Sequence, residues 1–327
     1  MTLPLLRLVP APSDIRGLRG VRGSPSFGAM RVIDAHVHLY PPAVNADPAG
    51  WARDQGETHW EVLCTRVRKS GLPVQGFPTV DELLRSMDEA DVERVVLQGW
   101  YWERQDNCRF QNRFFAEVQQ AHPDRISACG TLTVREGEAS ALEELRWCRD
   151  AGFCGLGELS PHSQGFSMDD PAWHRILDEA GEARLAVCLH VTEPAGRAYP
   201  GRILTPLDGF LGLARAHPST QFVLAHWGAR LPQDPALGAE ARALPNLAYD
   251  MAASPLLYDP AEVAATARAS GVDTVLFGSD FPLHLYPRDP AATGMTAWCD
   301  TVLDSGLTAP ELAAVLRENA RRLYRLP

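Results

Sequence analysis

The strongest constraint on the fold is a regular alternation of short apolar segments with longer amphipathic windows. After Met30 the sequence contains eight apolar segments of the kind that form buried strands, separated by windows with helical periodicity. This alternation is typical of a parallel sheet built from strand–helix units. The segments lie at residues 32–36, 94–98, 126–131, 154–158, 185–190, 221–226, 247–250 and 274–280. Eight such units predict an α/β protein with a closed (β/α)8 barrel, the TIM-barrel fold.

Helix-start signals mark several of the windows between these segments. Thr79 with Glu82, and Thr308 with Glu311, have the spacing of a capping box, in which the two side chains bind free N–H groups at a helix start. The length of 327 residues also suits one barrel better than two unrelated domains. We therefore predict a single catalytic barrel domain over residues 30–327.

The first 29 residues precede this domain and show neither helical nor strand periodicity. We predict that residues 1–29 form a disordered extension, and Met30 is an alternative start of the protein. A signal peptide is the competing interpretation. Against it, Arg7 and Pro10 interrupt the apolar stretch before it reaches the necessary length.

A long connection, residues 39–78, joins the first predicted strand to the first predicted helix. On an enzyme barrel, a loop of this length is more often a functional lid than a neutral insertion. The alternative is that Trp51 and Trp60 simply fold the loop onto the barrel.

Charge, cysteine usage and hydropathy narrow the classes of partner. The formal net charge is -10, which argues against a broad nucleic-acid interface. The 7 cysteines form no CxxC pair, and we expect a reducing cytoplasm. Because no apolar stretch approaches the roughly 18 residues of a membrane helix, we expect no membrane partner. The expected partner is a small-molecule substrate, with a weak expectation of a homo-oligomer.

Metal-binding residue types stand at the carboxyl ends of the predicted strands, where barrel enzymes build their active sites. His36 and His38 flank Val37, and residues two apart in a strand point to the same face, so both imidazoles can reach one ion. Other strands end in Glu158, His190, His226 and Asp280. Each residue alone could be a core histidine or a helix cap. Together they predict a metal centre.

A series of motifs around these residues resembles the motif series of the amidohydrolase superfamily. The motifs are DAHVH, GELSPHSQGF, LHVTEP, AHWG, GSDFP and ENARRLYRL, and they extend over about residues 31–325. The resemblance is strongest to the amidohydrolase-related branch, and the GLGEL stretch is also similar to the TatD-like hydrolases. The resemblance implies a metal-bound water and assigns Asp280 as the proton shuttle.

The sequence leaves open whether one or two divalent ions bind. With two ions, His36, His38 and Asp280 hold the first, His190 and His226 hold the second, and Glu158 bridges them. Many binuclear members of the superfamily use a carboxylated lysine as the bridge, but the single lysine here, Lys69, lies in the first loop. Glu158 is a hard oxygen donor that could replace it. With one ion, the ligands are His36, His38, His190 and Asp280, while His226 polarises the substrate and Glu158 lies behind the ligands. Zinc is the first choice of metal and manganese the second.

These residues lead us to expect a metal-dependent hydrolase in which a metal-bound water attacks a carbonyl, lactone, amide or phosphoester centre. The predicted catalytic residues are Asp280, His226 and Glu158, with Asp280 carrying the proton from the water to the leaving group. One alternative is a non-oxidative decarboxylase that uses the same residues with a single ion. The other is a non-catalytic, metal-bearing barrel used for binding or assembly.

Residues just past the strand ends are the candidates for substrate binding, because these loops face the pocket of a barrel. They are Trp100, Tyr101, Arg104, His162, Gln164, Trp227, Arg230, His284 and Arg288. A planar guanidinium donates two parallel hydrogen bonds to a carboxylate or phosphate, so the arginines favour a small anionic substrate. The alternative for each residue is a surface role, such as pairing with an acidic neighbour.

Overall fold

Eight parallel strands form the centre of the structure, a computed structural model that describes residues 31–286 and 294–327. The strands are hydrogen-bonded in sequence order, and every neighbouring pair is parallel. They are β1 (Val32–Val37), β2 (Val92–Gln98), β3 (Ile126–Gly130), β4 (Gly155–Leu159), β5 (Ala186–Leu189), β6 (Phe222–Leu224), β7 (Leu247–Asp250) and β8 (Val275–Leu276). Backbone bonds from Ala35 N to Phe277 O (2.8 Å) and from Asp280 N to His36 O (2.9 Å) connect β1 to the segment after β8. The predicted (β/α)8 barrel is confirmed.

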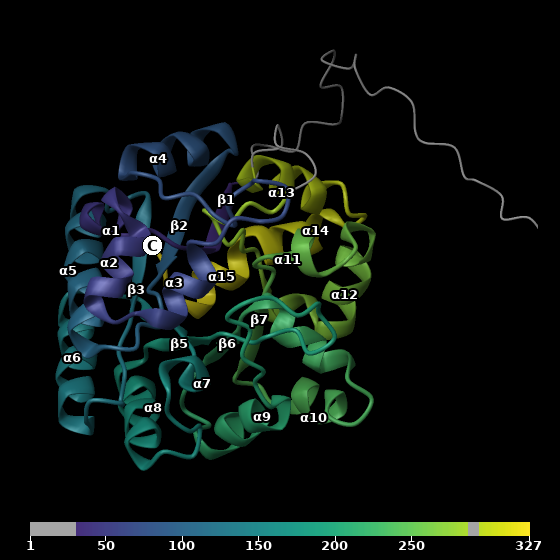
Figure 1. The fold of residues 1–327 in the computed structure, drawn as a ribbon. Helices are drawn as coiled ribbons and strands as arrows, with labels where there is room; N and C mark the ends of the chain where they lie inside the picture. The colour runs from purple at the N-terminus through teal and green to yellow at the C-terminus, as the bar shows by residue number, and fades with distance from the viewer. Residues whose placement is uncertain (1–30, 287–293) are drawn as a thin grey trace, which may run out of the picture. The chain divides into compact units, whose positions relative to one another are not determined.

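Helices surround the strands (Figure 1). The α-helices are α1 (Pro42–Ala46), α2 (Pro48–Gln55), α3 (Thr58–Cys64), α4 (Val80–Glu89), α5 (Gln105–Ala121), α6 (Glu138–Asp150), α7 (Pro161–Gln164), α8 (Pro171–Ala183), α9 (Leu207–Ala216), α10 (Gly238–Ala243), α11 (Ser254–Leu257), α12 (Val263–Ser270), α13 (Gly294–Leu303), α14 (Ala309–Ala313) and α15 (Asn319–Leu323). The 3-10 segments are η1 (His226–Gln233), η2 (Pro260–Glu262) and η3 (Val272–Thr274), and η4 (Ala314–Glu318) is a π-helical segment. Both predicted capping boxes are confirmed, at the starts of α4 and α14.

The strands are buried because helices cover the outside of the barrel and packed side chains fill its interior. Ile33, Val96, Val223 and Leu276 belong to one buried core cluster, which Tyr324 joins from the C-terminal end of the chain. The backbone therefore holds the strand ends in fixed positions around a common centre. Side chains at the carboxyl ends of different strands can meet there.

Two of the strands end at least two residues earlier than the sequence predicts. β6 ends at Leu224 and β8 at Leu276, so His226 and Asp280 lie in the turns that follow. Both residues have a left-handed backbone, with φ of 58° and 64°, which a strand does not allow. The apolar pattern extended the predicted strands because the residues before these turns are also buried.

The connection over residues 39–78 contains α1, α2 and α3 and is packed against the barrel through aromatic side chains. The ring of Trp51 lies 5.1 Å from that of Trp102, and the ring of Trp60 lies 5.4 Å from the same Trp102 ring. The two predicted tryptophans thus fold this segment onto the barrel. A role of the segment as a lid stays a prediction.

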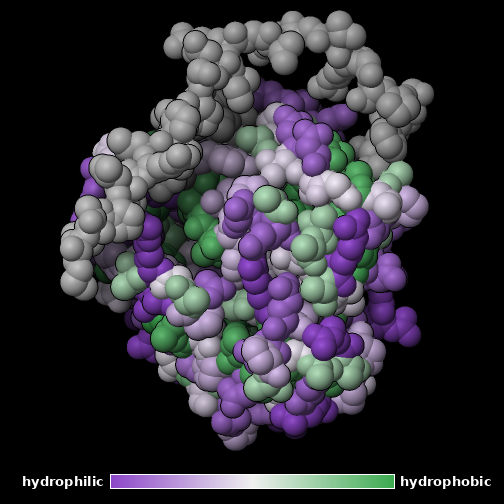
Figure 2. Space-filling view, turned by 90° about the vertical axis from the view of Figure 1, so that its right-hand side faces the viewer, coloured by the Kyte–Doolittle hydropathy of each residue, from purple (hydrophilic) through white to green (hydrophobic). Residues whose placement is uncertain are grey.

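The described surface is mixed in character. On the face shown in Figure 2, hydrophilic and hydrophobic side chains are interspersed. Within the two described ranges of the chain, no helix is both long and apolar enough to cross a membrane. The predicted disordered extension, residues 1–29, and the candidate Arg288 lie outside the described residues.

Candidate metal centre

The six predicted metal ligands converge at the carboxyl ends of the strands. His36, on β1, and His38, directly after it, have their Nε2 atoms 3.1 Å apart. Glu158, on β4, places its Oε2 atom 3.8 Å from His36 Nε2 and 3.6 Å from His38 Nε2. Asp280 places its Oδ1 atom 3.8 Å and 3.4 Å from the same two nitrogens. All four residues are at most 8% exposed.

The remaining two histidines face the other oxygen of Glu158. Its Oε1 atom lies 2.9 Å from His190 Nδ1 and 3.3 Å from His226 Nε2, and these two nitrogens are 3.2 Å apart. Asp280 Oδ2 lies 3.9 Å from His226 Nδ1. One carboxylate therefore separates two pairs of imidazoles, one pair on each of its oxygens.

Outward hydrogen bonds fix the tautomers of His36 and His38. His36 Nδ1 lies 2.8 Å from Asp250 Oδ2, and His38 Nδ1 lies 3.0 Å from the backbone oxygen of Gln98. A carboxylate and a carbonyl can only accept, so both Nδ1 atoms carry the proton and donate it. The Nε2 atoms, which face the centre, are left as the free nitrogens.

The same reasoning applies to His226 and His190. His226 Nδ1 donates to the backbone oxygen of Ala252 (3.1 Å), which leaves Nε2 free. His190 Nε2 lies 3.2 Å from the hydroxyl of Thr192, which itself donates to the backbone oxygen of Ile203 (2.6 Å). The Thr192 oxygen must therefore accept from His190 Nε2, which leaves Nδ1 facing Glu158.

The carboxylates and free nitrogens of the cluster require positive charge to balance them. Burial raises the pKa of Glu158, but His190 and His36 outweigh it and hold that pKa well below its ordinary value. Burial also lowers the pKa of His226, yet Glu158 raises it to about 9. Four free nitrogens and two carboxylates thus converge in a buried space. Either extra protons or a cation must balance them.

This donor set fits a divalent metal ion. Imidazole nitrogens and carboxylate oxygens are the ligands that zinc and manganese accept, and histidine ligands usually donate their outer nitrogen to a carbonyl or carboxylate, as here. Among the described residues, three groups of side chains have ligand atoms close enough to hold an ion, and two of them lie within this cluster, while the third joins His36 to Cys188 and Asp250. The two groups within the cluster are His36 with His38 and Glu158, and Glu158 with His190 and His226.

Asp250 is a member of the site that the sequence analysis missed. It ends β7, is 1% exposed, and contacts His36 through Oδ2. Its Oδ1 accepts the backbone N–H groups of His226 and Ala252, both at 3.0 Å. The rule that found the other ligands, a metal-binding residue type at the carboxyl end of a strand, also applies to Asp250.

A strained turn carries His226. From His226 to Arg230, five successive residues have φ between 52° and 61°, and only Gly228 among them lacks a side chain. Each non-glycine residue in this region costs roughly 1 kcal/mol or more. The turn is held by the Asp250 bond to His226 N and by Trp227 Nε1, which donates to Ser254 Oγ (2.6 Å).

Trp100 and Tyr101 form an aromatic wall beside the histidines. Their rings are stacked with centroids 4.2 Å apart. The ring of Trp100 lies 5.4 Å from that of His38, and the ring of Tyr101 lies 5.2 Å from that of His190. Both predicted substrate contacts therefore border the cluster directly, and their role in binding stays a prediction.

Several other predicted substrate residues have structural partners instead. The buried side chain of Gln164 donates to the backbone oxygens of Trp102 (3.0 Å) and Leu132 (2.8 Å). Trp227 is 2% exposed and is bonded to Ser254, as described above. These two residues support the loops, and the geometry does not bring them into the cluster.

The charged candidates on the rim differ from one another. Arg230 lies over the ring of Tyr258 (4.0 Å) and pairs with Glu262. The exposed side chain of Arg104 is 3.8 Å from Glu136. His162, in α7, is half-buried and its Nδ1 has no hydrogen-bond partner among the described residues.

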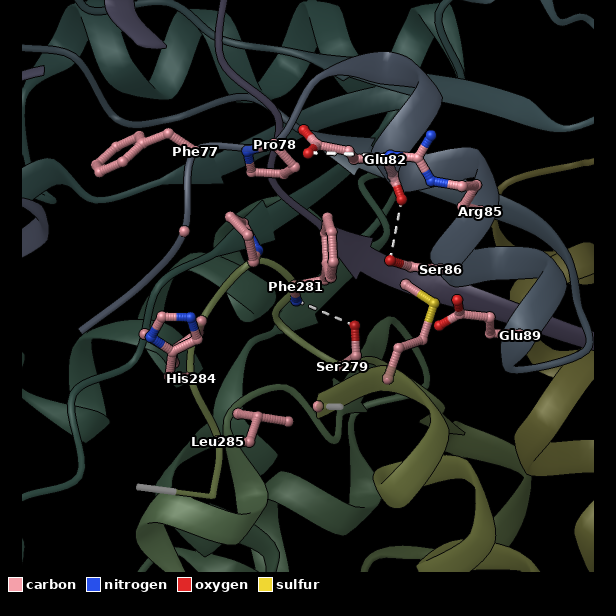
Figure 3. A pocket seen from close by; sticks show the side chains of 15 residues that line it. Phe77, Pro78, Glu82, Arg85, Ser86, Glu89, Ser279, Phe281, His284 and Leu285 are labelled. Carbon is pink, nitrogen blue, oxygen red and sulfur yellow. Dashed lines mark hydrogen bonds and ion pairs between the residues drawn. The ribbon is translucent and has the colours of Figure 1, made fainter. Parts of the chain in front are cut away.

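His284 belongs to a separate hollow of about 480 Å³ on the side of the barrel (Figure 3). The hollow lies between α4 and the segment after β8, and Phe77, Arg85 and Phe281 are among its lining residues. His284 Nδ1 is bonded to the backbone oxygen of Pro73 (2.8 Å). The six converging residues do not line this hollow, although Ser279 and Phe281 flank Asp280 in the chain.

Comparison with known proteins places the fold and the cluster in a family context. Residues 33–326 match the model of the amidohydrolase family. The chain is 25% identical over 339 residues to a 6-methylsalicylic acid decarboxylase of Aspergillus aculeatus, covering 89% of this chain and 95% of that protein. It is 27% identical over 232 residues to a gamma-resorcylate decarboxylase of Rhodococcus jostii, covering 60% and 66%.

Solved structures show the same fold. A 5-carboxyvanillate decarboxylase from Sphingomonas paucimobilis has a TM-score of 0.70 at 19% identity, covering 91% of this chain and 100% of the other. A dihydroxybenzoic acid decarboxylase from Polaromonas, crystallised with bound manganese, has a TM-score of 0.63 at 18% identity, covering 90% and 97%.

These comparisons correct the expected activity. The prediction of a hydrolase, in which a metal-bound water attacks a carbonyl, lactone, amide or phosphoester, is wrong, because the similar proteins are decarboxylases. The findings favour the alternative that the sequence analysis kept beside it. The ligand residues do not separate the two reactions, since the same histidines and carboxylates serve either one.

Proposed function

Because the chain belongs to the amidohydrolase family, we propose that it is a metal-dependent, non-oxidative decarboxylase of a small aromatic acid. The observation that best supports this proposal is the aromatic wall. Trp100 and Tyr101 are stacked and touch His38 and His190, so a planar ring lying on them has its substituents beside the cluster. The similar proteins named above act on hydroxylated aromatic acids, which supports a substrate with a hydroxyl group near its carboxylate.

We assign His36, His38 and Asp280 as ligands of the ion, because their Nε2 and Oδ1 atoms face one space. Glu158 Oε2 faces the same space. Its other oxygen, Oε1, faces His190 and His226 on the opposite side of the carboxylate. A bound divalent ion would neutralise the negative charge of the substrate's carboxylate and hydroxyl oxygens. Manganese and zinc both suit these ligands, and manganese is present in the similar Polaromonas enzyme.

Decarboxylation requires one proton at the ring carbon that bears the carboxylate. Once that carbon is protonated, the carbon–carbon bond breaks, its electron pair restores the aromatic ring, and carbon dioxide leaves. We assign His226 as the residue that holds this proton. Its ring is fixed by Ala252 on one side, and its Nε2 faces Glu158 at 3.3 Å in the cluster.

Arg66 is our candidate for binding a further anionic group of the substrate. Its guanidinium lies 5.1 Å over the ring of Tyr199, and its Nε donates to the backbone oxygen of Leu63 (3.1 Å). In the described part of the chain, no carboxylate lies within 4 Å of its guanidinium nitrogens. Arg230 and Arg104, two of the three arginines predicted for this task, are near Glu262 and Glu136 instead.

The proposal can be tested on protein loaded with manganese. Incubation with 6-methylsalicylate, 2,6-dihydroxybenzoate or 5-carboxyvanillate should release carbon dioxide and the corresponding arene, measured by chromatography. In deuterated water the product should carry one deuterium at the carbon that lost the carboxylate. A His226→Gln variant should keep its metal content and lose turnover. If fully loaded protein leaves every hydroxylated aromatic acid of such a panel intact, the proposal is wrong.

A further inference from the structure

Asp250 connects two parts of the metal centre that come from different strands. Its Oδ2 contacts the ring of His36, a ligand on β1, at 2.8 Å. Its Oδ1 accepts the backbone N–H groups of His226 and Ala252. His226 begins the turn after β6, and its side chain donates to the backbone oxygen of Ala252. The carboxylate is 1% exposed, so the described protein atoms rather than water satisfy it.

These contacts determine which nitrogen of His36 is free. We propose that Asp250 is a positioning residue that fixes the proton of His36 on Nδ1 and anchors the strained turn of His226. This inference rests on the metal centre of the proposed function, and it assigns a task to a residue outside the ligand set. With the proton on Nδ1, the lone pair of Nε2 points toward His38 Nε2, 3.1 Å away, where the ion is expected.

A second buried aspartate provides a matched comparison. Asp34 is 0% exposed and accepts the backbone N–H groups of His36 (3.1 Å) and Ser279 (3.0 Å) through one oxygen. It therefore lies beside the same ligand and in a comparable environment. Its described contacts are with backbone N–H groups and the Ser279 side chain, so it has no control over an imidazole proton.

The change Asp250→Asn separates the two tasks. The amide oxygen can still accept from His226 N and Ala252 N, but the amide nitrogen then donates toward His36 Nδ1. His36 must accept this bond and carry its proton on Nε2, where it blocks the ion. If the amide rotates, its oxygen again accepts from His36 Nδ1. Its N–H donors then face the N–H donor of His226. Either arrangement weakens metal binding, and loss of such an outer partner typically lowers affinity about 10- to 100-fold.

Zinc is the suitable probe because it is diamagnetic. Zinc affinity can be measured by competition with a coloured chelator, and the His36 Nδ1–H signal can be followed by NMR in protein labelled with ¹⁵N-histidine. A His36→Gln variant assigns that signal. We expect Asp250→Asn to bind zinc about 10- to 100-fold more weakly and to lose or shift the signal. Asp34→Asn should retain both, and Asp250→Glu should recover part of the affinity because its side chain can only accept.

Three outcomes would overturn the inference. They are unchanged zinc affinity in Asp250→Asn, an unchanged His36 signal in that variant, and an equal loss of affinity in Asp34→Asn. Thermal unfolding followed by circular dichroism reports whether each variant is folded. If Asp250→Asn does not fold, Asp250→Glu still tests the inference. Neither measurement depends on turnover. Intact aromatic acids together with the expected zinc and NMR results would therefore refute the decarboxylase and leave the role of Asp250 standing.

Discussion

Replacing Glu57 by alanine should destabilise the aromatic wall, and the cost should depend on pH. Glu57 lies between α2 and α3 and is 1% exposed. It accepts the backbone N–H groups of Glu103 (2.8 Å) and Arg104 (3.1 Å) and the side-chain amide of Asn107 (2.6 Å). Glu103 and Arg104 lie between the aromatic residues 100–102 and α5, and Asn107 lies in the first turn of α5. Glu57 therefore ties the segment between the wall and α5 to a distant part of the chain and holds the wall in place.

The magnitude follows from these three bonds. Alanine leaves three donors without an acceptor, at about 1 kcal/mol each, so the variant should lose about 3 kcal/mol of unfolding free energy at pH 8. Burial raises the pKa of Glu57 from 4.5 to about 7, although its three donors oppose this. Between these two pH values the folded protein keeps a proton on Glu57 that the unfolded chain releases. The corresponding stability is present below pH 4.5 and is lost as the pH rises to about 7.

Glu57→Ala removes that pH dependence. At about 1.4 kcal/mol per pKa unit, the variant should therefore be destabilised by about 2 to 3 kcal/mol more at pH 5 than at pH 8. Urea unfolding of metal-free protein at both pH values measures the difference. Glu61→Ala, which removes a surface pair with Arg53 on the same segment, should cost less than about 1 kcal/mol. A penalty for Glu57→Ala that is equal at both pH values, or larger at pH 8, would refute the reasoning.

Three further predictions concern the site itself. Glu158→Gln should weaken binding of the single divalent ion, measured by competition with a chelator, because a neutral amide replaces the carboxylate whose Oε2 faces the space of the ion; unchanged affinity would contradict a role of Glu158 at the ion. Trp100→Ala should raise KM for an aromatic acid about tenfold without changing metal content, whereas Phe110→Ala, at the 41% exposed edge of the same aromatic cluster, should not. Chelation should lower Tm and added manganese should restore it, because the converging nitrogens and carboxylates are balanced by a cation; an unchanged Tm would argue against a bound ion in the folded protein.

The sequence could predict the barrel because the signal for it is local and repeated. Each strand is an apolar run that ends at a buried position, and the eight runs close in chain order. His36, His38 and Glu158 were predictable because in a closed barrel the strand ends share one face. The distances between these residues could not be predicted, since they depend on turns such as the left-handed one at His226. The residues of that turn show no sequence pattern that predicts it.

The partners of the predicted loop residues were less accessible to sequence reasoning. Gln164 and Trp227 have the same residue types that a substrate site would use, but they satisfy buried backbone and hydroxyl groups. Arg66 was not among the predicted substrate residues, because its relation to Tyr199 links two long loops that lie 133 positions apart in the chain. Contacts of this kind come from the folded arrangement of loops and have no short-range signal.

The ligands alone could not decide between hydrolysis and decarboxylation. Both reactions use a divalent ion, and in both an acidic group must hand over a proton, so His226 and Asp280 are equally suited to either. The difference lies in what stands beside the ion. A hydrolase must leave room for an attacking water, whereas a decarboxylase must hold a flat ring with its carboxylate-bearing carbon close to a proton donor. In the function that we propose, the stacked wall of Trp100 and Tyr101, which lies beside His38 and His190, would meet the second requirement. The specificity of this barrel should therefore change when the wall changes, while its metal binding should change when Asp250 does.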